Sequence, residues 1–325
     1  CILKLSTNNM QLAAPFSAIS TPLESHVMAR GHFAISEKQA ASVIKEMQGK
    51  GNVIESVGTA RNYEQALKTC CDYMKEFKLG GLRDLTPSQA NQYLEIRAQE
   101  CSQRTLNMDR QAIQCMMQHV SGQLSTSEKL TVVESQKETI ENSRAYTPEQ
   151  VNAIIQHQTE QHALSTQLCH EAGLRAHELF TLRPSGEVTP SPREVHPDKF
   201  TQLPNQTQTY TVTGKGGLIR EVQIPSHLVD KLEERRLEIP QRISDRGVNY
   251  ESHYDIAGGH KFSDAFSKAS SRALGYSNGA HGLRHSYAQD RYEQLANHFE
   301  RIDVMTIISQ ELGHFRPDIT EVYLR

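Results

Sequence analysis

The sequence predicts a mainly α-helical protein with a small β-sheet, built as an all-α domain followed by a mixed α/β domain. Apolar residues recur at helical spacing through residues 36–121. A polar stretch rich in Ser, Thr and Glu follows at 122–146, and it is typical of a linker because no helical period survives there. Residues 147–325 are again largely helical in pattern but include one strand–turn–strand segment. The length of 325 residues suits two domains of roughly 150 residues each.

Composition excludes several classes of protein. Hydrophobic residues make up 37% of the chain and charged residues 22%, which is typical of a folded globular protein. No apolar run approaches the ~18 residues of a membrane span, so an integral membrane protein is not expected. The six cysteines include no CxxC pair and are expected to be reduced thiols of a cytosolic protein. The formal net charge of −3 argues against a non-specific nucleic-acid coat but permits a focused basic cleft.

The N-terminal part is predicted to be an arm and a four-helix module. Residues 1–35 show no sustained period and are expected to form an arm or a poorly ordered lead-in. Ser36 and Thr59 are suitable N-caps for the first two helices, and Pro87 suits the first turn of the third. The four predicted helices span residues 37–47, 60–77, 86–101 and 102–120.

In the second domain, residues 147–325, one hairpin is expected among helices. Residues 207–213 alternate (TQTYTVT), a GKGG turn follows, and 218–224 return, which predicts a β-hairpin with Lys215 at its tip. Residues 238–260 show no regular pattern and are predicted to be irregular. The predicted helices begin at Thr147 and then span 163–182, 226–237, 262–274, 283–299, 304–312 and 318–324.

Four short segments carry residues suited to chemistry, although each alone has an ordinary structural explanation. Arg175 and Glu178 are three apart, so on the predicted helix they share a face, as a surface ion pair would. Lys215 alone would be a solvated turn lysine. His281 and Arg284 are again three apart at a helix start, and His314 precedes Tyr323 by nine residues.

A zinc site formed by His281 and His285 is a weaker interpretation. The two histidines are four apart, as in the HExxH motif, but no acidic residue stands between them in the position of the base. No metal ligand set is therefore predicted.

Taken together, these residues suit attack on a phosphodiester. The transition state concentrates negative charge on the non-bridging oxygens, and planar guanidinium groups bind such charge bidentately. A phenol needs a proton acceptor and a positive field before it attacks. The departing sugar oxygen needs a proton donor, and a lysine can supply that proton. With enough cationic side chains, neither Mg²⁺ nor another cofactor is required.

The order of these residues along the chain resembles that of the tyrosine recombinase (phage integrase) family. GLRAHEL, from Gly173, is similar to the family's first arginine box, and HGLRHSYA, from His281, to its second. The segment LGH…ITEVYL resembles the terminal box that carries the nucleophile, and YTVTGKGGLIREVQIP resembles the hairpin that delivers the lysine. The resemblance covers 147–325 as the catalytic domain, and the module at 36–121 fits the family's core-binding domain.

The resemblance implies a role for each residue. Tyr323 would be the nucleophile that forms a 3′-phosphotyrosine, and Lys215 would protonate the leaving 5′ oxygen. His281 would act as acid and base near the tyrosine, and Glu178 would support the cations. The residues that would bind the scissile phosphate are Arg175, Arg284 and His314.

The family also implies fold and partners. The two domains would form a C-shaped clamp around double-stranded DNA carrying a specific recombination site, with a homo-tetramer on DNA and a dimer or monomer without it. A cytoplasmic, nucleoid-associated protein of bacterial or phage origin is expected. Three features depart from the family. Arg284 and His314 lie 30 residues apart, and the stretch between Arg175 and Lys215 is long and rich in proline. The chain also ends two residues after Tyr323, where members usually continue into a tail that docks on a neighbouring protomer.

Three functions remain open on the sequence. The leading hypothesis is a site-specific recombinase that integrates or excises a mobile element. The same residues would also serve a type IB topoisomerase-like nicking and closing enzyme. A DNA-binding protein that has kept the fold without cleavage is the third, although a pure binder has no use for a positioned nucleophile.

Overall fold

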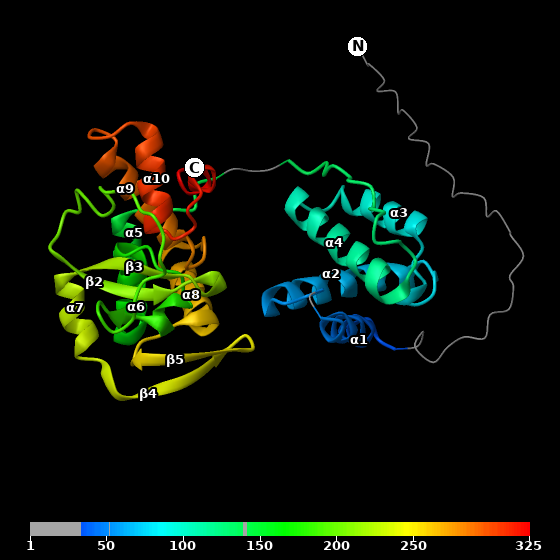
Figure 1. Ribbon diagram of the computed structural model, residues 1–325, viewed down its shortest axis with the longest axis horizontal. Helices are drawn as coiled ribbons and strands as arrows, with labels where there is room; N and C mark the ends of the chain where they lie inside the picture. Colours follow the sequence, from blue (N-terminus) through cyan, green and yellow to red (C-terminus); the bar gives the residue numbers. More distant parts are fainter. Residues whose placement is uncertain (1–33, 52, 139–141) are drawn as a thin grey trace, which may run out of the picture. The chain divides into compact units, whose positions relative to one another are not determined.

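The computed structural model describes residues 34–51, 53–138 and 142–325 (Figure 1). The chain divides into two compact units, the first ending at Lys137 and the second beginning at Glu138. The arm predicted for 1–35 lies outside the described residues, apart from its last two. Within the described ranges, no helix is both long enough and apolar enough to cross a membrane.

The first unit is all-α, as predicted. Thr86 caps the third helix by accepting a hydrogen bond from the Gln89 amide at 3.3 Å, and Ser102 caps the fourth in the same way. Its core comprises fully buried side chains such as Leu67, Met74 and Leu94. The helices are α1 (Ser36–Gly49), α2 (Val57–Glu76), α3 (Pro87–Arg97) and α4 (Gln103–Met116), with a short 3₁₀ turn η2 (Leu82–Asp84) before α3 and a π-helical turn η3 (Met117–Ser121) after α4.

The segment after α4 is not the free linker that the sequence predicts for 122–146. It forms no helix or strand in its described part, yet Leu124 and Leu130 are buried in the core of the first unit. Gln103 on α4 donates to the carbonyl of Val133 at 3.1 Å and accepts from the Ser135 amide at 2.7 Å. Two isolated leucines and the amide side chains of Gln103, Gln114 and Gln118 therefore dock a stretch whose composition is otherwise that of a linker.

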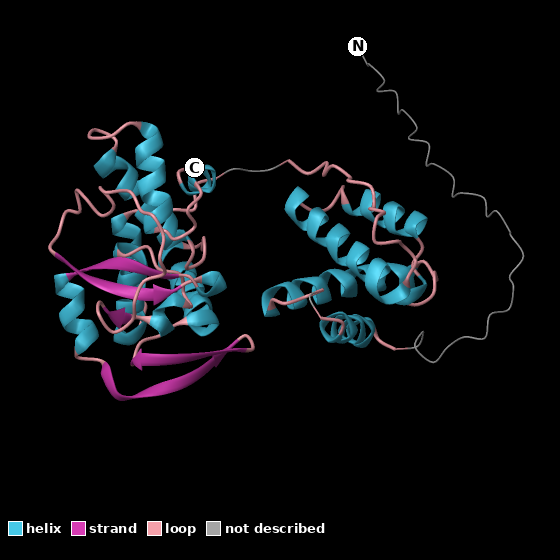
Figure 2. Ribbon diagram, in the orientation of Figure 1, coloured by secondary structure: helices cyan, strands magenta, loops and turns pink. Residues whose placement is uncertain are grey.

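The second unit is mixed α/β and contains two antiparallel sheets (Figure 2). The predicted hairpin is confirmed: β2 (Thr207–Thr213) pairs with β3 (Ile219–Pro225) around the turn η5 (Lys215–Gly217), and β1 (Arg183–Pro184) pairs with the other edge of β2. The remaining elements are α5 (Pro148–Ile155), α6 (Glu160–Glu171), η4 (Glu178–Thr181), α7 (Ser226–Glu233), β4 (Arg236–Asp245), β5 (Val248–Tyr254), α8 (Gly259–Leu274), α9 (Gly282–Leu295), α10 (Arg301–Glu311), α11 (Pro317–Thr320) and η6 (Glu321–Tyr323).

The predicted helix 163–182 is wrong in its second half, because α6 ends at Glu171. Gly173 has a φ of +59°, a left-handed conformation that ends a helix and that glycine adopts readily. A Cβ atom at this position would lie only 2.7 Å from the ring of Tyr287. The chain therefore turns sharply after α6, and residues 174–181 form a turn and the 3₁₀ helix η4 instead.

The prediction that 238–260 is irregular is also wrong. Strands β4 and β5 form a second hairpin, with Asp245 paired to Val248 at its tip. Most β4 residues are exposed, and Ile239 keeps 80% of its surface accessible. A strand that is exposed on both faces has no reason to alternate apolar with polar residues, so it lacks the pattern on which strand prediction depends.

Candidate active site

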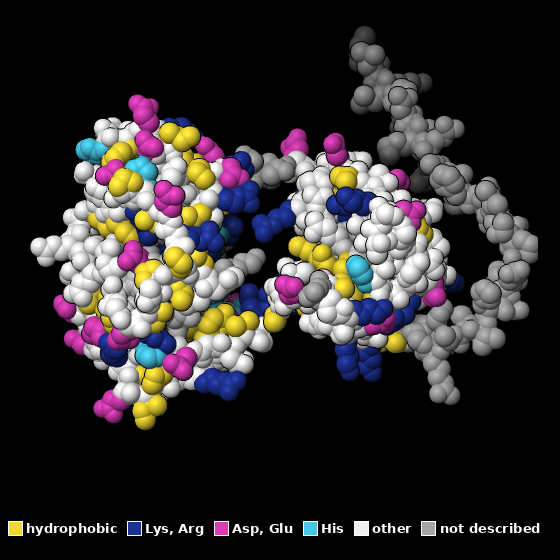
Figure 3. All heavy atoms as spheres, viewed as in Figure 1, with side chains coloured by type: hydrophobic (Ala, Val, Ile, Leu, Met, Phe, Trp, Pro, Cys, Tyr) yellow, Lys and Arg dark blue, Asp and Glu magenta, His cyan; other side chains and the backbone are white. Residues whose placement is uncertain are grey.

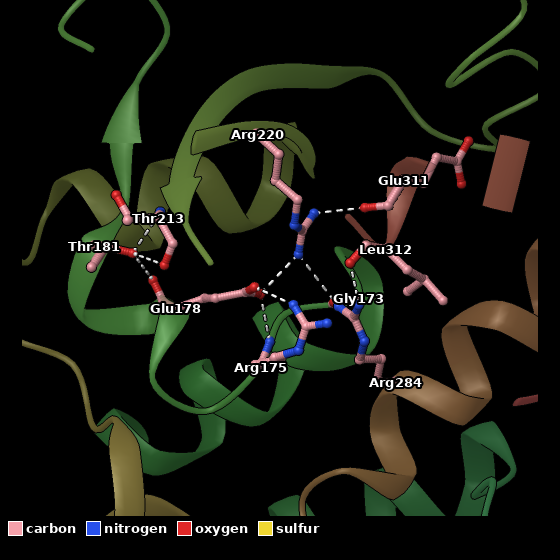
Figure 4. A network of polar contacts seen from close by, with 9 residues as sticks. All are labelled: Gly173, Arg175, Glu178, Thr181, Thr213, Arg220, Arg284, Glu311 and Leu312. Carbon is pink, nitrogen blue, oxygen red and sulfur yellow. Dashed lines mark hydrogen bonds and ion pairs between the residues drawn. The ribbon is translucent and has the colours of Figure 1, made fainter. Parts of the chain in front are cut away.

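Arg284 lies at the centre of a network of polar contacts in the second unit (Figure 4). It belongs to the first turn of α9, and none of its surface is accessible to solvent. Its Nη1 group donates to the carbonyl of Gly173, in the turn after α6, and its Nη2 group donates to the carbonyl of Leu312, at the end of α10. One guanidinium thus holds three separate segments of the chain together.

Glu178 accepts hydrogen bonds from two further arginines. Its buried carboxylate receives Nη1 of Arg175 at 2.7 Å and Nη2 of Arg220 at 2.8 Å, and it also receives the backbone amide of Arg175 at 2.8 Å. Burial alone would raise the pKa of Glu178, but Arg220, Arg284 and Arg175 outweigh it and hold that pKa at about 2. The predicted pair of Arg175 and Glu178 exists, although it is formed by a turn and η4 and not by the face of an α-helix.

Arg220 is a site residue that the sequence analysis missed. It points inward from β3, is 3% exposed, and donates from Nη1 to the carbonyl of Glu311 at 2.6 Å. Gly313 permits this approach, since a Cβ atom there would lie 2.3 Å from Cδ of Arg220. A signal did exist: Arg220 alternates with Val222 and Ile224 on the core face of a strand, and an arginine at such a position needs a buried anionic or carbonyl partner.

Tyr323 lies in a pocket of imidazole rings. It occupies the 3₁₀ turn η6 at the end of the chain and is 7% exposed. Its ring centroid lies 5.8 Å from that of His314, in a nearly parallel stack, and 5.6 Å from that of His281. His285 is closer still, at 4.7 Å, and the guanidinium carbon of Arg284 lies 5.7 Å from the centre of the phenol ring. The phenol therefore stands beside a buried positive charge and three rings that can exchange protons.

These three imidazoles are neutral at pH 7 in the protein without DNA. Partial burial, aided by the charge of Arg284, lowers the pKa of His281, part of whose surface stays exposed, to about 3 and that of His314 to about 4. Burial together with Arg144 lowers the pKa of His285 to about 4. Each ring can therefore accept a proton. The sequence suggests His285 only as a candidate zinc ligand and gives no sign of its contact with Tyr323.

The turn that carries Lys215 begins beside the same cluster. Gly214 lies so close to Glu178 that a Cβ atom added to it would be 3.2 Å from the carboxylate and 3.8 Å from Nη1 of Arg175. Lys215 follows directly as the first residue of η5. Strands β2 and β3 thus bring the predicted lysine turn to the arginine and glutamate cluster.

We expect acid to destabilise the second unit through these histidines. Their pKa values are lowered in the folded state, so between pH 6.5 and about 4 the unfolded chain binds more protons, and stability falls as the pH falls. For buried His285 the loss at pH 5 is about 2 kcal/mol, whereas solvent screening makes the contribution of exposed His281 smaller. Burial raises the pKa of Asp290 to about 6, so protonation of this residue stabilises the folded state as the pH falls. This gain offsets only part of the stability lost through the histidines.

The measurement is urea unfolding of the chain followed by circular dichroism at pH 7, 6 and 5. A His285→Asn variant should lose less stability between pH 7 and pH 5 than the unchanged chain. The matched substitution of exposed His298 should leave the pH dependence as it was. Equal stability of the unchanged chain at all three pH values would contradict the lowered pKa values.

Comparisons with known proteins rest on structure alone. No family model matches the sequence, and no curated protein matches it either. Among solved structures, XerH site-specific recombinase bound to a palindromic difH substrate has a TM-score of 0.54 at 14% identity, covering 90% of this chain and 93% of that one. A lambda integrase dimer bound to a COC′ core site also has a TM-score of 0.54, at 16% identity, covering 89% of this chain and 76% of that one. The Tn1549 transposon integrase with transposon right-end DNA has a TM-score of 0.50 at 13% identity, covering 88% and 94%.

The chain has the fold of a tyrosine recombinase. The predicted fold class, mainly α with a small β-sheet, is confirmed. Within this tyrosine recombinase fold, the residues that the sequence singled out lie in one cluster: Arg175, Glu178, His281, Arg284, His314 and Tyr323, with the turn of Lys215 beside it. Among the residues with described coordinates, no group of three or more His, Cys, Asp or Glu side chains is arranged to hold a metal ion.

Proposed function

We propose that this chain is a site-specific DNA recombinase that cuts and rejoins duplex DNA through a 3′-phosphotyrosine on Tyr323. The observation that carries the proposal is the position of the Tyr323 ring, 5.7 Å from the buried guanidinium of Arg284 and surrounded by three neutral imidazoles. A tyrosine that served only packing would not need such neighbours, because Arg284 and His285 are buried and a buried polar group is costly. XerH, which shares the fold, was solved bound to a palindromic difH substrate, and the Tn1549 transposon integrase was solved in complex with transposon right-end DNA.

In the cleavage step, Oη of Tyr323 attacks the scissile phosphorus. A bond forms between Oη and phosphorus while the bond from phosphorus to the 5′ oxygen breaks. The phenol proton passes to a neutral imidazole, for which His281 is placed 5.6 Å away ring to ring, and Lys215 gives a proton to the departing 5′ oxygen. Rejoining is the reverse reaction with a 5′ hydroxyl as the attacking group, so the phosphotyrosine bond stores the energy of the broken strand.

Arg175 and Arg284 would contribute differently to binding the phosphate. Each outer nitrogen of Arg284 donates to a backbone carbonyl, and the whole side chain is buried, so this residue supplies a fixed positive field beside the phosphate. The side chain of Arg175 keeps 23% of its surface exposed, and Glu178 engages only its Nη1 group. Arg175 is therefore the arginine that offers donors to a non-bridging oxygen, and His314 adds a further donor.

DNA binding and assembly follow from the same proposal. Figure 3 shows Lys and Arg side chains gathered along the edge of the second unit beside the C-terminal end, where a phosphate backbone would be drawn to the site. The two units would close as a clamp on the duplex, with four chains joining two duplexes. A lambda integrase tetramer has been solved on a Holliday junction, which supports this assembly. Integration or excision of a bacterial mobile element is the role we favour.

Covalent trapping tests the proposal and recovers the target sequence in the same experiment. The chain is incubated with sheared genomic DNA from its source, stopped with SDS, and the DNA that remains attached to protein is sequenced. A duplex made from the recovered site, nicked next to the scissile phosphate, should then give a band at the summed mass of protein and DNA. Binding of that duplex with no covalent band would contradict the recombinase and favour the non-cleaving DNA-binding protein.

A second assay separates the two cleaving functions. A recombinase should join strands from two different duplexes that carry the recovered site. Relaxation of a supercoiled plasmid without any joined product would instead favour the topoisomerase-like enzyme.

A further inference from the structure

A buried carboxylate outside the predicted site residues is fully engaged by its neighbours. Glu311, at the end of α10, is 1% exposed. Its Oε1 accepts from Nη2 of Arg291 at 2.9 Å and from the backbone amide of Phe200 at 3.0 Å. Its Oε2 accepts from Nε of Arg291 at 2.9 Å and from the hydroxyl of Tyr287 at 3.0 Å. Four donors from α9 and from the loop before β2 therefore fix this one side chain.

The backbone next to this carboxylate receives the site arginines. The carbonyl of Glu311 itself accepts from Arg220, and the carbonyl of the next residue, Leu312, accepts from Arg284 (Figure 4). A shift of the peptide at 311–312 would therefore move both guanidinium groups together. Since Arg220 in turn donates to Glu178, such a shift would also reach the partner of Arg175.

The loop before β2 is hydrogen-bonded to both Glu311 and Arg291. Nη2 of Arg291 also donates to the carbonyl of Thr201 at 2.8 Å, so the same arginine forms hydrogen bonds with both Glu311 and the loop. Phe200, whose amide binds Glu311, has a φ of +68°, a conformation that a bulky residue adopts only when its surroundings hold it there. Phe200 thus ties the loop to the end of α10, and Thr201 ties it to Arg291 on α9.

We infer that Glu311 is a positioning residue for the phosphate-binding site, and that it acts through the carbonyl groups of residues 311 and 312 on Arg220 and Arg284. Its side chain fixes the end of α10, and the end of α10 fixes the two arginines. The inference rests on the proposed function for its effect on DNA cleavage, but the geometry of the arginines can be tested without DNA.

The first test is a Glu311→Gln variant, with Glu293→Gln on exposed α9 surface as the matched control. Glutamine offers one acceptor oxygen in place of two and leaves the charge of Arg291 without its partner. We expect covalent complex formation to slow about 10- to 100-fold while the affinity for duplex DNA is unchanged. Cleavage by Glu311→Gln at the rate of the control would overturn the inference.

A double variant separates positioning from simple stability. Replacing both Arg291 and Glu311 by methionine leaves no uncompensated buried charge, although the Phe200 amide and the Tyr287 hydroxyl lose their acceptor, so this variant should be more stable than Glu311→Gln. Cleavage should nevertheless stay about 10- to 100-fold slow, because no carboxylate then ties α10 to Tyr287 and Phe200. Recovery of cleavage together with stability would show that the pair is merely structural.

The DNA-free readout is the titration of His314 by NMR. Burial and the charge of Arg284 together hold the pKa of His314 at about 4, so displacement of Arg284 should raise that pKa. Loss of the negative charge of Glu311 would by itself lower it, so the two effects have opposite signs. The double variant removes the charges of Arg291 and Glu311 together, so an unchanged His314 titration in it would overturn the inference, whereas failure of the unchanged chain to form any covalent complex would overturn the proposed function instead.

Discussion

A Tyr323→Phe variant is expected to lose covalent complex formation by more than about 10⁴-fold, because phenylalanine has no oxygen with which to attack phosphorus. The ring would keep its contacts with His281, His285 and His314, so the free energy of unfolding should change by less than about 1 kcal/mol. The measurement is the SDS-resistant band formed with the nicked duplex, together with the affinity for the intact duplex, which should be unchanged.

The control for this experiment is Tyr292→Phe. Tyr292 lies on the adjacent helix α9, and its hydroxyl accepts a hydrogen bond from the exposed Arg301. It should cleave as the unchanged chain does. A covalent band that persisted in Tyr323→Phe would mean that another side chain attacks the phosphate, and the assignment of the nucleophile would be wrong.

An Arg284→Lys variant is expected to cleave about 10²- to 10³-fold more slowly. The ammonium group keeps the charge but lacks the planar fork that reaches the carbonyls of Gly173 and Leu312 at the same time. One buried carbonyl would then lose its donor, which costs about 1–3 kcal/mol of stability. The rate is measured as single-turnover formation of the covalent complex.

Arg272→Lys is the matched control, since Arg272 also donates to a backbone carbonyl, that of His157, but on the exposed surface of α8. It should leave both rate and stability unchanged. If Arg284→Lys cleaved at the rate of this control, charge alone would suffice at position 284, and the geometric role of the guanidinium fork would be disproved.

The sequence predicted well wherever a residue's neighbours along the chain decide its structure. The caps at Thr86 and Thr147 and the alternation at 207–213 each indicated an element that the structure contains. The prediction failed where distant contacts decide. Gly173 ends α6 against the ring of Tyr287, which is more than a hundred residues away, and Leu130 docks a polar segment onto a helical core.

The residues of the candidate site were also predicted only in part from the sequence. The order of Arg175, Lys215, His281, Arg284, His314 and Tyr323 was enough to suggest one chemistry, because those residue types serve few other purposes together. The sequence did not reveal Arg220 or Glu311. An arginine in a strand and a glutamate near a helix end look ordinary until their buried partners are known.

By itself, the sequence determined the helical character of the chain, its small sheet and the set of groups that can act on a phosphodiester, because local periodicity and side-chain chemistry are written in residue order. Only the tertiary structure decided that Arg284 is held by carbonyls from two other segments, that three imidazoles stay neutral beside Tyr323, and that Glu311 is bound by four donors. Burial and hydrogen bonding between remote segments set these properties, and they exist only once the chain has folded.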